Sequence, residues 1–512
     1  MLILCLGSEY FHQAFQKMGH SVLIAPHQEG LPIDTLFNGL QDRPDLIVYT
    51  DHLGQHCFPE GLSNIYGIPK IYYAVDTPIN FWWQRHFAHL FDFTFVDQKP
   101  YAEGLADEGL AAAWLPVAVN LASYQSEGSA EGGQSYDFGF VGTMGAKRPK
   151  RVRLLEALSN RYSLKTAGDR QEGWVTPEES GQIYRQSKLA LNECLFPGVT
   201  TRMMEAMASG AVLFTEKAGG DLGELFKPGE DFAWFEPEEL IGAAEYWLGD
   251  AKKRRKTAKR ALEKMAASHD VSNRAEAMFN AIKRVHFGRA LVDCEAWDHE
   301  AQAMYLTAMR WPQESGVARI MRAERLFEKA LEARTITPTS LYMLGQIKRH
   351  RKDPEKATEF LTRANEGGEP RGALGMALMK VCTGDLEASR DWLVRFTGDA
   401  GLGPVEPNTL PFEHVKGIAR RLMELGHDLS PGFSRLIHDP ADWNALEFYQ
   451  AASSSRPDDL ETAQELAGLL LNRGAEAEAL EVAQKALEFH PDDQTLGGIF
   501  AQAGRASYLT LN

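Results

Sequence analysis

Two charged residues stand out in the segment TTRMMEAMASG, whose other residues are small or apolar. Arg202 and Glu205 are three positions apart, and residues at this spacing share one face of a helix. Such an arginine can bind a phosphate, while a carboxylate one turn later can accept hydrogen bonds from the hydroxyls of a ribose. The pair therefore predicts a site for a nucleoside diphosphate. The alternative is an exposed ion pair on a surface helix, but the small neighbouring residues favour a buried helix.

The residues on either side of this pair predict a strand, a loop and a helix start. Residues 188–194 (KLALNEC) are typical of a buried strand, and the loop after them contains Gly198. Thr200 or Thr201 is expected to cap the helix, which should end at Gly210. The free backbone N–H groups and the positive dipole end of a helix start attract anions, so this arrangement suits a diphosphate.

The wider pattern predicts an α/β fold with two Rossmann-like, doubly wound domains. Short apolar runs alternate with helical patterns, which is typical of parallel strands joined by crossover helices. A first domain over residues 1–121 has expected strands at 2–7, 45–50, 71–76, 93–98 and 111–116. The polar, glycine-rich stretch 122–133 is expected to be a linker. A second domain over residues 134–285 has expected strands at 136–142, 163–168, 188–194, 211–216 and 231–236.

From about residue 296 the pattern becomes helical and repeats itself. Residues 340–370 and 463–493 carry small or apolar residues at matching offsets, which are Ala357, Leu361 and Ala364 in one and Ala479, Ala483 and Ala486 in the other. This spacing resembles the tetratricopeptide repeat of roughly 34 residues, in which small residues let two helices approach closely. We therefore expect a tetratricopeptide-like helical repeat domain over residues 296–512, with an irregular helical bundle as the alternative.

Composition limits the function classes. The chain has 512 residues and a formal net charge of −16, the wrong sign for a protein that coats nucleic acid or an anionic membrane. The basic run 251–260 contains no aromatic residue and is more typical of a solvated helix face than of a nucleic-acid site. Five cysteines without paired spacing fit a reducing compartment. We expect a cytoplasmic protein without a membrane span, and we interpret the opening MLILCLG as a buried strand.

Candidate catalytic residues follow two strands of the first domain. Asp51 and His52 come after one apolar run, and Asp76 comes after the next. Ligands of open α/β sheets bind at the carboxyl ends of the strands, so each of the three could take a proton from an acceptor hydroxyl. Helix capping or turn formation is the ordinary use of Asp at such positions and stays open. The histidine and cysteine spacing in HLGQHC matches no firm ligand set, so no metal site is expected.

A resemblance to a known family adds to this interpretation. The run of 65 residues from Tyr184 to Leu248 resembles the C-terminal half of group-1 glycosyltransferases with the GT-B fold, and most of all their CgeB-like branch. The segments FVGTMGAKRPKRVRLLEAL and WLPVAVN are similar to further parts of that branch, as is HDVSNRAEAM with His269 and Arg274. The resemblance extends over most of residues 1–285.

The resemblance implies roles for individual residues. Glu205 would bind the nucleotide ribose, and Arg202 matches the arginine that precedes this glutamate in the CgeB-like branch. The backbone at Gly142 and Thr143 would approach the donor phosphates. A basic residue among Lys147, Arg148 and Arg151 would neutralise the leaving diphosphate in place of a metal, by electrostatic stabilisation of a developing charge.

One position departs from the family pattern. Many group-1 enzymes carry a second glutamate eight residues before the first, where this chain has Pro197, while Glu193 lies nearby but out of register. The resemblance implies a metal-independent glycosyltransferase without a cofactor, which moves a sugar from a UDP- or GDP-type donor to a hydroxyl acceptor. Because a repeat array offers a concave surface for an extended partner, we expect the repeats to dock a protein acceptor or partner. The alternatives are a catalytically degenerate scaffold, and a GT-B enzyme acting on a lipid or small glycan whose repeats serve self-association.

Overall fold

The computed structural model describes most of the chain. The described residues are 1–52, 56–125, 134–144, 148–168, 173, 175–194, 196–217, 220–283, 287–288, 290–311, 315–406, 410–427, 444–472 and 475–507. Most of the expected linker, residues 126–133, therefore lies outside the described part, while its beginning belongs to the short helix α5 (Leu121–Tyr124).

The first domain is built on a parallel sheet of six strands in the order β2-β1-β3-β4-β5-β6. Its strands are β1 (Leu2–Gly7), β2 (Ser21–Ile24), β3 (Leu46–Thr50), β4 (Lys70–Ala74), β5 (Phe93–Val96) and β6 (Ala112–Trp114). Every residue of β3, β4 and β5 is buried, as expected for strands covered by helices on both faces. The covering helices include α1 (His12–Lys17), α2 (Ile33–Asn38), α3 (Thr77–Phe87) and α4 (Lys99–Asp107).

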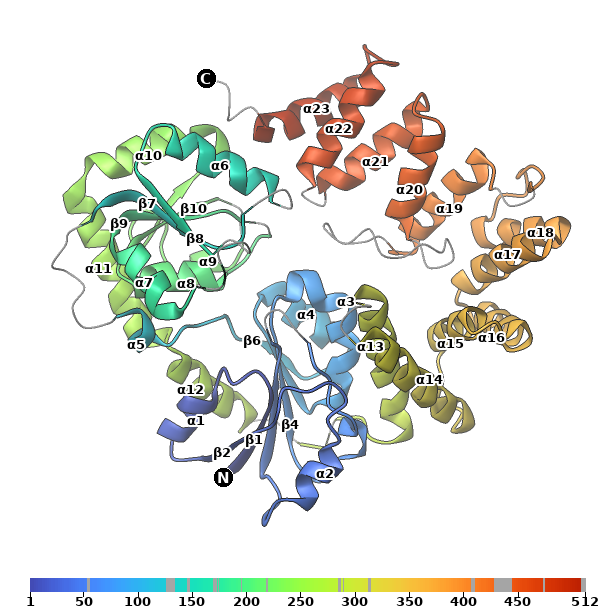
Figure 1. Ribbon diagram of the computed structural model, residues 1–512, viewed down its shortest axis with the longest axis horizontal. Coiled ribbons are helices and arrows are strands. Elements are labelled where there is room, and N and C mark those ends of the chain that lie inside the picture. The colour runs from blue at the N-terminus through green and yellow to red at the C-terminus, as the bar shows by residue number, and fades with distance from the viewer. Residues whose placement is uncertain are drawn as a thin grey trace.

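The second domain has a parallel sheet of five strands in the order β11-β10-β9-β7-β8. Its strands are β7 (Tyr136–Val141), β8 (Leu164–Ala167), β9 (Ser187–Asn192), β10 (Val212–Glu216) and β11 (Ala233–Phe235). The helices between and after them include α6 (Pro149–Ser159), α7 (Pro177–Arg185), α8 (Thr201–Ala208), α9 (Leu222–Leu225), α10 (Leu240–Gly249) and α11 (Ala251–Ser268). The prediction of two Rossmann-like domains is confirmed (Figure 1).

The chain returns to the first domain after α11. Helix α12 (Val271–Ile282) packs against α1, where the rings of Phe15 and Phe279 lie 5.5 Å apart. Nε of Arg274 donates a hydrogen bond of 2.7 Å to the carbonyl of Pro116. The last helix of the expected segment 134–285 is thus part of the packing of the first domain.

The remaining described residues are helical. The helices are α13 (Cys294–Arg310), α14 (Gly316–Glu332), α15 (Pro338–His350), α16 (Pro354–Glu366), α17 (Arg371–Thr383), α18 (Leu386–Thr397), α19 (Phe412–Glu424), α20 (Ala445–Ser455), α21 (Leu460–Asn472), α22 (Glu476–Leu487) and α23 (Gln494–Ser507). Consecutive helices pack together, and a Cβ on Gly345 or Gly375 would come within 2.9 Å of the Leu361 side chain. Small residues therefore allow the close approach of helices, while the tetratricopeptide subtype stays a prediction.

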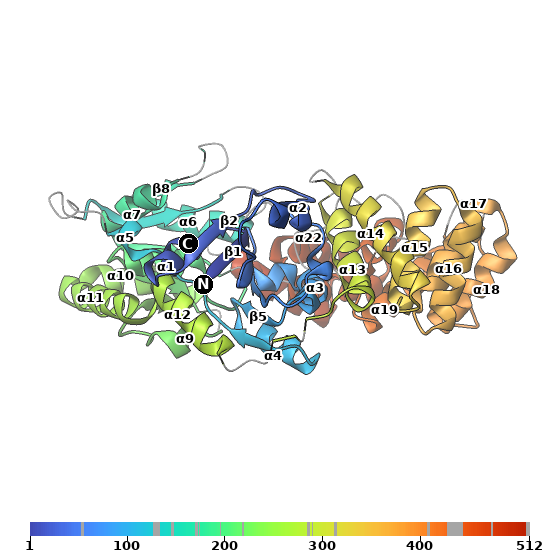
Figure 2. The same ribbon diagram turned by 90° about the horizontal axis from the view of Figure 1, so that it is seen from below.

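These helices form an arc that joins the two sheet domains (Figures 1 and 2). At one end, α13 packs on α3, and at the other, α23 lies against α6. Buried Arg319 of α14 donates to Glu29 and to the carbonyl of His56, so the first end is firmly attached. At the second end, Arg153 and Glu476 form an ion pair of 3.9 Å.

Candidate functional site

The predicted arginine and glutamate lie at the start of α8, at the carboxyl edge of the second sheet. Nε of Arg202 donates to the carbonyl of Val141 at 2.8 Å, and Nη1 donates to Oδ1 of Asn192 at 3.2 Å. Oε1 of Glu205 accepts a 2.9 Å hydrogen bond from the hydroxyl of Tyr124. Burial raises the pKa of Glu205 above its ordinary value, while this hydrogen bond and the charge of Arg202 oppose the rise.

Glycines let the backbone pack closely at this edge. Gly142 follows β7 with φ +151°, and a Cβ there would overlap the guanidinium of Arg202. Gly198 has φ +146°, and a Cβ there would overlap the amide of Gln98. Both glycines are therefore required by neighbouring side chains as well as by their backbone conformation.

The start of α8 has the expected N-cap residue but lacks a side-chain capping hydrogen bond. Thr200 occupies the N-cap position and Thr201 is the first helical residue, as expected. The Thr200 side chain forms no capping hydrogen bond, and its hydroxyl instead lies 3.5 Å from Oδ1 of Asn192. The helix ends at Ala208, two residues before Gly210, whose φ is +76°.

The basic residues after β7 have different surroundings. Nε and Nη2 of Arg151 both donate to Oε2 of Glu193, at 3.1 and 2.9 Å, and Nη1 donates to the carbonyl of Thr143 at 2.7 Å. Buried Arg151 thus holds the loop after β7 in place. Arg148 precedes α6, and its charge opposes the rise that desolvation causes in the pKa of Asp76. Lys147 is outside the described residues.

Three carboxylates follow consecutive strands of the first sheet, namely Asp51 after β3, Asp76 after β4 and Asp97 after β5. Oδ2 of Asp51 accepts hydrogen bonds from the Tyr72 hydroxyl, the backbone N–H of Val75 and the Gln84 amide, at 2.8, 3.1 and 2.7 Å. Asp51 is 3% exposed, and burial raises its pKa to about 7. Its position is inside the domain, where it supports the turn after β4.

Asp97 supports the same turn from the other side. Its Oδ2 accepts the backbone N–H of Asp76 at 2.8 Å, and its Oδ1 accepts the backbone N–H of Thr77 at 3.2 Å. Burial also raises the pKa of Asp97 to about 7. Asp51 and Asp97 therefore hold the turn that carries Asp76.

Asp76 itself is strained and accessible. Its φ of +53° and ψ of +38° are left-handed, a conformation that non-glycine residues rarely adopt and that is concentrated at functional sites. Asp76 is exposed, yet partial desolvation by the surrounding protein raises its pKa above the ordinary value, and the charge of Arg148 opposes the rise. His52 lies beside this edge, with its ring stacked on His27 at 4.4 Å.

Three residues of the site were not among the predicted ones. Asp97 and Gln98 are the last two residues of the expected strand 93–98 and directly follow β5 in the structure, so their place at the sheet edge was a usable signal. The Gln98 amide donates to the carbonyl of Val199 at 2.8 Å and accepts from its N–H at 3.0 Å, which joins the two domains. Tyr124 had no such signal, because its contact with Glu205 spans 81 positions.

Within the described part of the chain, no group of three or more His, Cys, Asp or Glu side chains is arranged to hold a metal ion. The described helices also include none that is long and apolar enough to cross a membrane.

Residues 148–280 match the protein family described as "Glycosyl transferase-like". The match includes α6, α8 and the residues Arg202 and Glu205. No curated protein matches the chain.

Several solved structures are similar to the chain. HepE from Anabaena in complex with UDP and glucose is 12% identical, with a TM-score of 0.41, over 56% of this chain and 99% of that one. Sucrose-phosphate synthase from Thermosynechococcus elongatus is 12% identical, with a TM-score of 0.41, over 55% and 98%. A glycosyltransferase from Rickettsia africae is 9% identical, with a TM-score of 0.37, over 55% and 89%.

Proposed function

We propose that the protein is a glycosyltransferase that moves a sugar from a nucleoside diphosphate donor of the UDP or GDP type to a hydroxyl acceptor. The observation that carries the proposal is the pair Arg202 and Glu205 at the start of α8, inside the segment that matches the glycosyl transferase-like family. The resemblance of residues 184–248 to the CgeB-like branch supports the same assignment.

The donor would bind along the carboxyl edge of the second sheet. Glu205 would accept hydrogen bonds from the ribose through Oε2, because Oε1 is held by Tyr124. The backbone at Gly142 and Thr143 would approach the phosphates, with Arg202 and Arg151 fixing that loop. Helix starts and fixed arginines supply the positive potential that a diphosphate needs.

Arg148 would neutralise the leaving diphosphate, because the charge of Arg151 is already balanced by Glu193. Preorganised positive charge of this kind stabilises a developing charge without a metal. Activity that a chelator abolishes and manganese restores would contradict this metal-independent mechanism.

Asp76 would take the proton from the acceptor hydroxyl. Its raised pKa makes it a stronger base than an ordinary aspartate, and its turn is fixed by Asp51 and Asp97. Asp76 is a better candidate for this base than the other two predicted residues, because solvent reaches it. Asp51 is buried, and the ring of His52 stacks on His27.

The helical arc would present a protein acceptor to this site. The arc is attached to both sheet domains, so a chain bound along it stays close to both of them (Figure 1). Repeat arrays offer extended surfaces for such partners.

Donor binding tests the proposal directly. We expect UDP or GDP to raise the melting temperature of the full-length protein, because a ligand of the folded state stabilises it by mass action. Glu205→Ala should weaken nucleotide binding by roughly 1 to 3 kcal/mol, the range for unpaired buried polar groups. Glu263→Ala is the control, since this glutamate of α11 is exposed and its 3.8 Å ion pair with Lys259 lies within the same helix.

A catalytically degenerate scaffold is the alternative, and Pro197 at the position of the usual second glutamate favours it. If no nucleoside diphosphate binds, or Glu205→Ala leaves nucleotide affinity unchanged while partner binding persists, the transferase proposal fails and the scaffold stands.

A further inference from the structure

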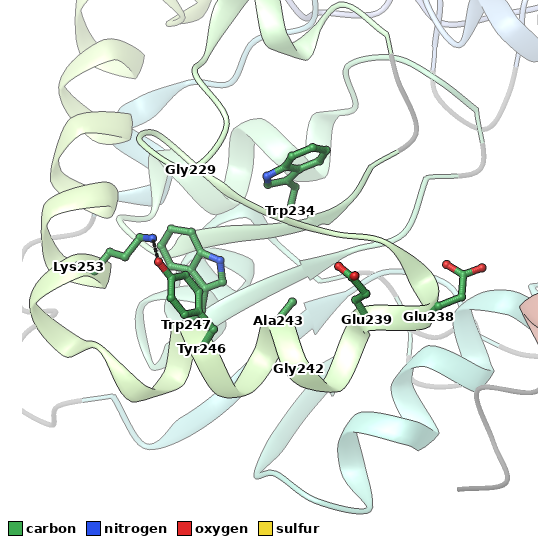
Figure 3. Close-up of a pocket in the computed structure, with 9 residues that line it drawn as sticks. All are labelled: Gly229, Trp234, Glu238, Glu239, Gly242, Ala243, Tyr246, Trp247 and Lys253. Carbon is green, nitrogen blue, oxygen red and sulfur yellow. Dashed lines mark hydrogen bonds between the residues drawn. The ribbon is translucent and has the colours of Figure 1, made fainter.

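A hollow lies on the second domain, formed by elements that carry none of the site residues described above. Its volume is about 580 Å³, within the range of about 300 to 1,000 Å³ typical of small-molecule sites. It is lined by residues of β11, of the short helix η3 (Pro237–Glu239), of α10 and α11, and of the loop before β11. These are Gly229, Trp234, Glu238, Glu239, Gly242, Ala243, Tyr246, Trp247 and Lys253 (Figure 3).

Exposed aromatic side chains form part of its wall. Trp234 of the edge strand β11 is 39% exposed and Tyr246 of α10 is 60% exposed, whereas the neighbouring Trp247 is buried. Figure 3 shows Trp234 across the hollow from Tyr246 and Trp247. Large aromatic side chains exposed to water beside a hollow mark a binding surface, because covering them with a ligand is favourable.

Each of these rings already has an ammonium group beside it. Nζ of Lys253 lies 4.3 Å from the ring centroids of both Tyr246 and Trp247 and donates a 2.6 Å hydrogen bond to the Tyr246 hydroxyl. Nζ of Lys217 lies 4.3 Å from the ring centroid of Trp234. The cation–π positions are therefore occupied by the protein's own lysines, which disfavours a cationic ligand.

The carboxylates beside the hollow disfavour an anionic ligand. Glu238 and Glu239 line the hollow at one end, where they would repel a phosphate or another anion (Figure 3). Carboxylate oxygens are acceptors only, so a matching ligand must donate hydrogen bonds. A ligand that is neutral, has apolar C–H faces for the rings and carries hydroxyl donors for the carboxylates satisfies all of these conditions.

We propose that this hollow binds a neutral saccharide, away from the nucleotide site. The faces of Trp234 and Tyr246 that Lys217 and Lys253 leave uncovered would pack on the sugar, and Glu238 and Glu239 would accept hydrogen bonds from its hydroxyls. The proposal does not depend on sugar transfer, because a scaffold protein could bind a glycan at the same place.

Binding to an array of neutral glycans, followed by saturation-transfer NMR with the best-bound glycan, tests this. We expect the full-length protein to bind at least one neutral glycan, with at least a tenfold loss of affinity in Trp234→Ala and in Tyr246→Ala. Phe489→Ala is the matched control, because Phe489 is a similarly exposed aromatic residue (50%) that does not line the hollow. It should bind the glycan as the unsubstituted protein does.

Glycan binding at the hollow can be tested independently of nucleotide binding. Trp234→Ala should keep any melting shift caused by UDP or GDP, which also shows that the variant is folded, and Tyr246→Ser serves if Trp234→Ala does not fold. Three results would overturn the proposal. They are binding of no neutral glycan, glycan affinity in Trp234→Ala and Tyr246→Ala equal to that of the unsubstituted protein, and a preference for phosphorylated or cationic ligands.

Discussion

The hydroxyl of Tyr124 donates a 2.9 Å hydrogen bond to Oε1 of Glu205. Tyr124 belongs to the segment that leaves the first sheet, while Glu205 lies on the helix after β9 of the second. The interaction orients the carboxylate that the proposed function assigns to the ribose, and it connects that orientation to the path of the chain between the domains.

Tyr124→Phe should therefore weaken nucleotide binding without unfolding the protein. We expect a loss of about 1 kcal/mol, or roughly fivefold in Kd, because one net hydrogen bond to Glu205 is removed. Calorimetric titration with UDP or GDP measures it, with Tyr162→Phe as the control, a tyrosine that packs against Phe138. An unchanged Kd in Tyr124→Phe would show that this hydrogen bond does not position the carboxylate.

Asp76→Asn should separate chemistry from binding. Asparagine tolerates the left-handed conformation of Asp76, whose φ is +53°, so the turn should persist while the base is lost. We expect kcat for sugar transfer to fall by about 100-fold or more with unchanged nucleotide affinity. Transfer by Asp76→Asn at the rate of the unsubstituted protein would remove Asp76 from the proposed mechanism.

The attachment of the helical arc depends on a buried arginine of α14. Arg322 donates to the carbonyl of Phe58 at 3.0 Å, and it also pairs with buried Glu300. Arg322→Met should lower the free energy of unfolding by about 3 to 5 kcal/mol, because it leaves a carboxylate buried without its partner. Urea unfolding measures this loss. Arg325→Met on the same helix removes only an exposed pair with Glu60 and should lower it by less than about 1 kcal/mol.

The same interface should be sensitive to acid. His86 and His89 meet His299 of α13, with the rings of His89 and His299 stacked at 3.7 Å and Arg85 and Arg371 nearby. Burial lowers the pKa of His86 to about 3 and the pKa values of His89 and His299 to about 4.

Folding therefore keeps these rings neutral at pH values where the unfolded chain, with histidine pKa values of about 6.5, binds protons. Their stabilising contribution is present above about pH 6.5 and is lost as the pH falls from there toward 4. Melting temperatures from pH 7.5 to 4.5 should show this loss, and His299→Phe should reduce it. Equal pH dependence in both proteins would contradict the assignment.

Much of the fold follows from local pattern. The alternation of apolar runs and helical segments predicts both parallel sheets, because strands covered on both faces must be continuously apolar. The predicted strand, glycine loop and helix at 188–210 are all present, and Arg202 and Glu205 lie where their spacing places them. Self-similar small residues likewise predict packed helices after residue 296.

What the sequence determined by itself is thus the set of elements and the positions of the candidate residues along them, since both depend on periodicities of a few residues. Tertiary structure decided the rest. Asp51 and Asp76 looked equivalent as strand-end carboxylates, but the packing of Gln84 and Tyr72 encloses Asp51 and leaves Asp76 accessible. The contacts of Tyr124 with Glu205 and of Gln98 with Val199 join residues 81 and 101 positions apart. No local periodicity contains such pairings, because they arise only when the two sheet domains pack against each other.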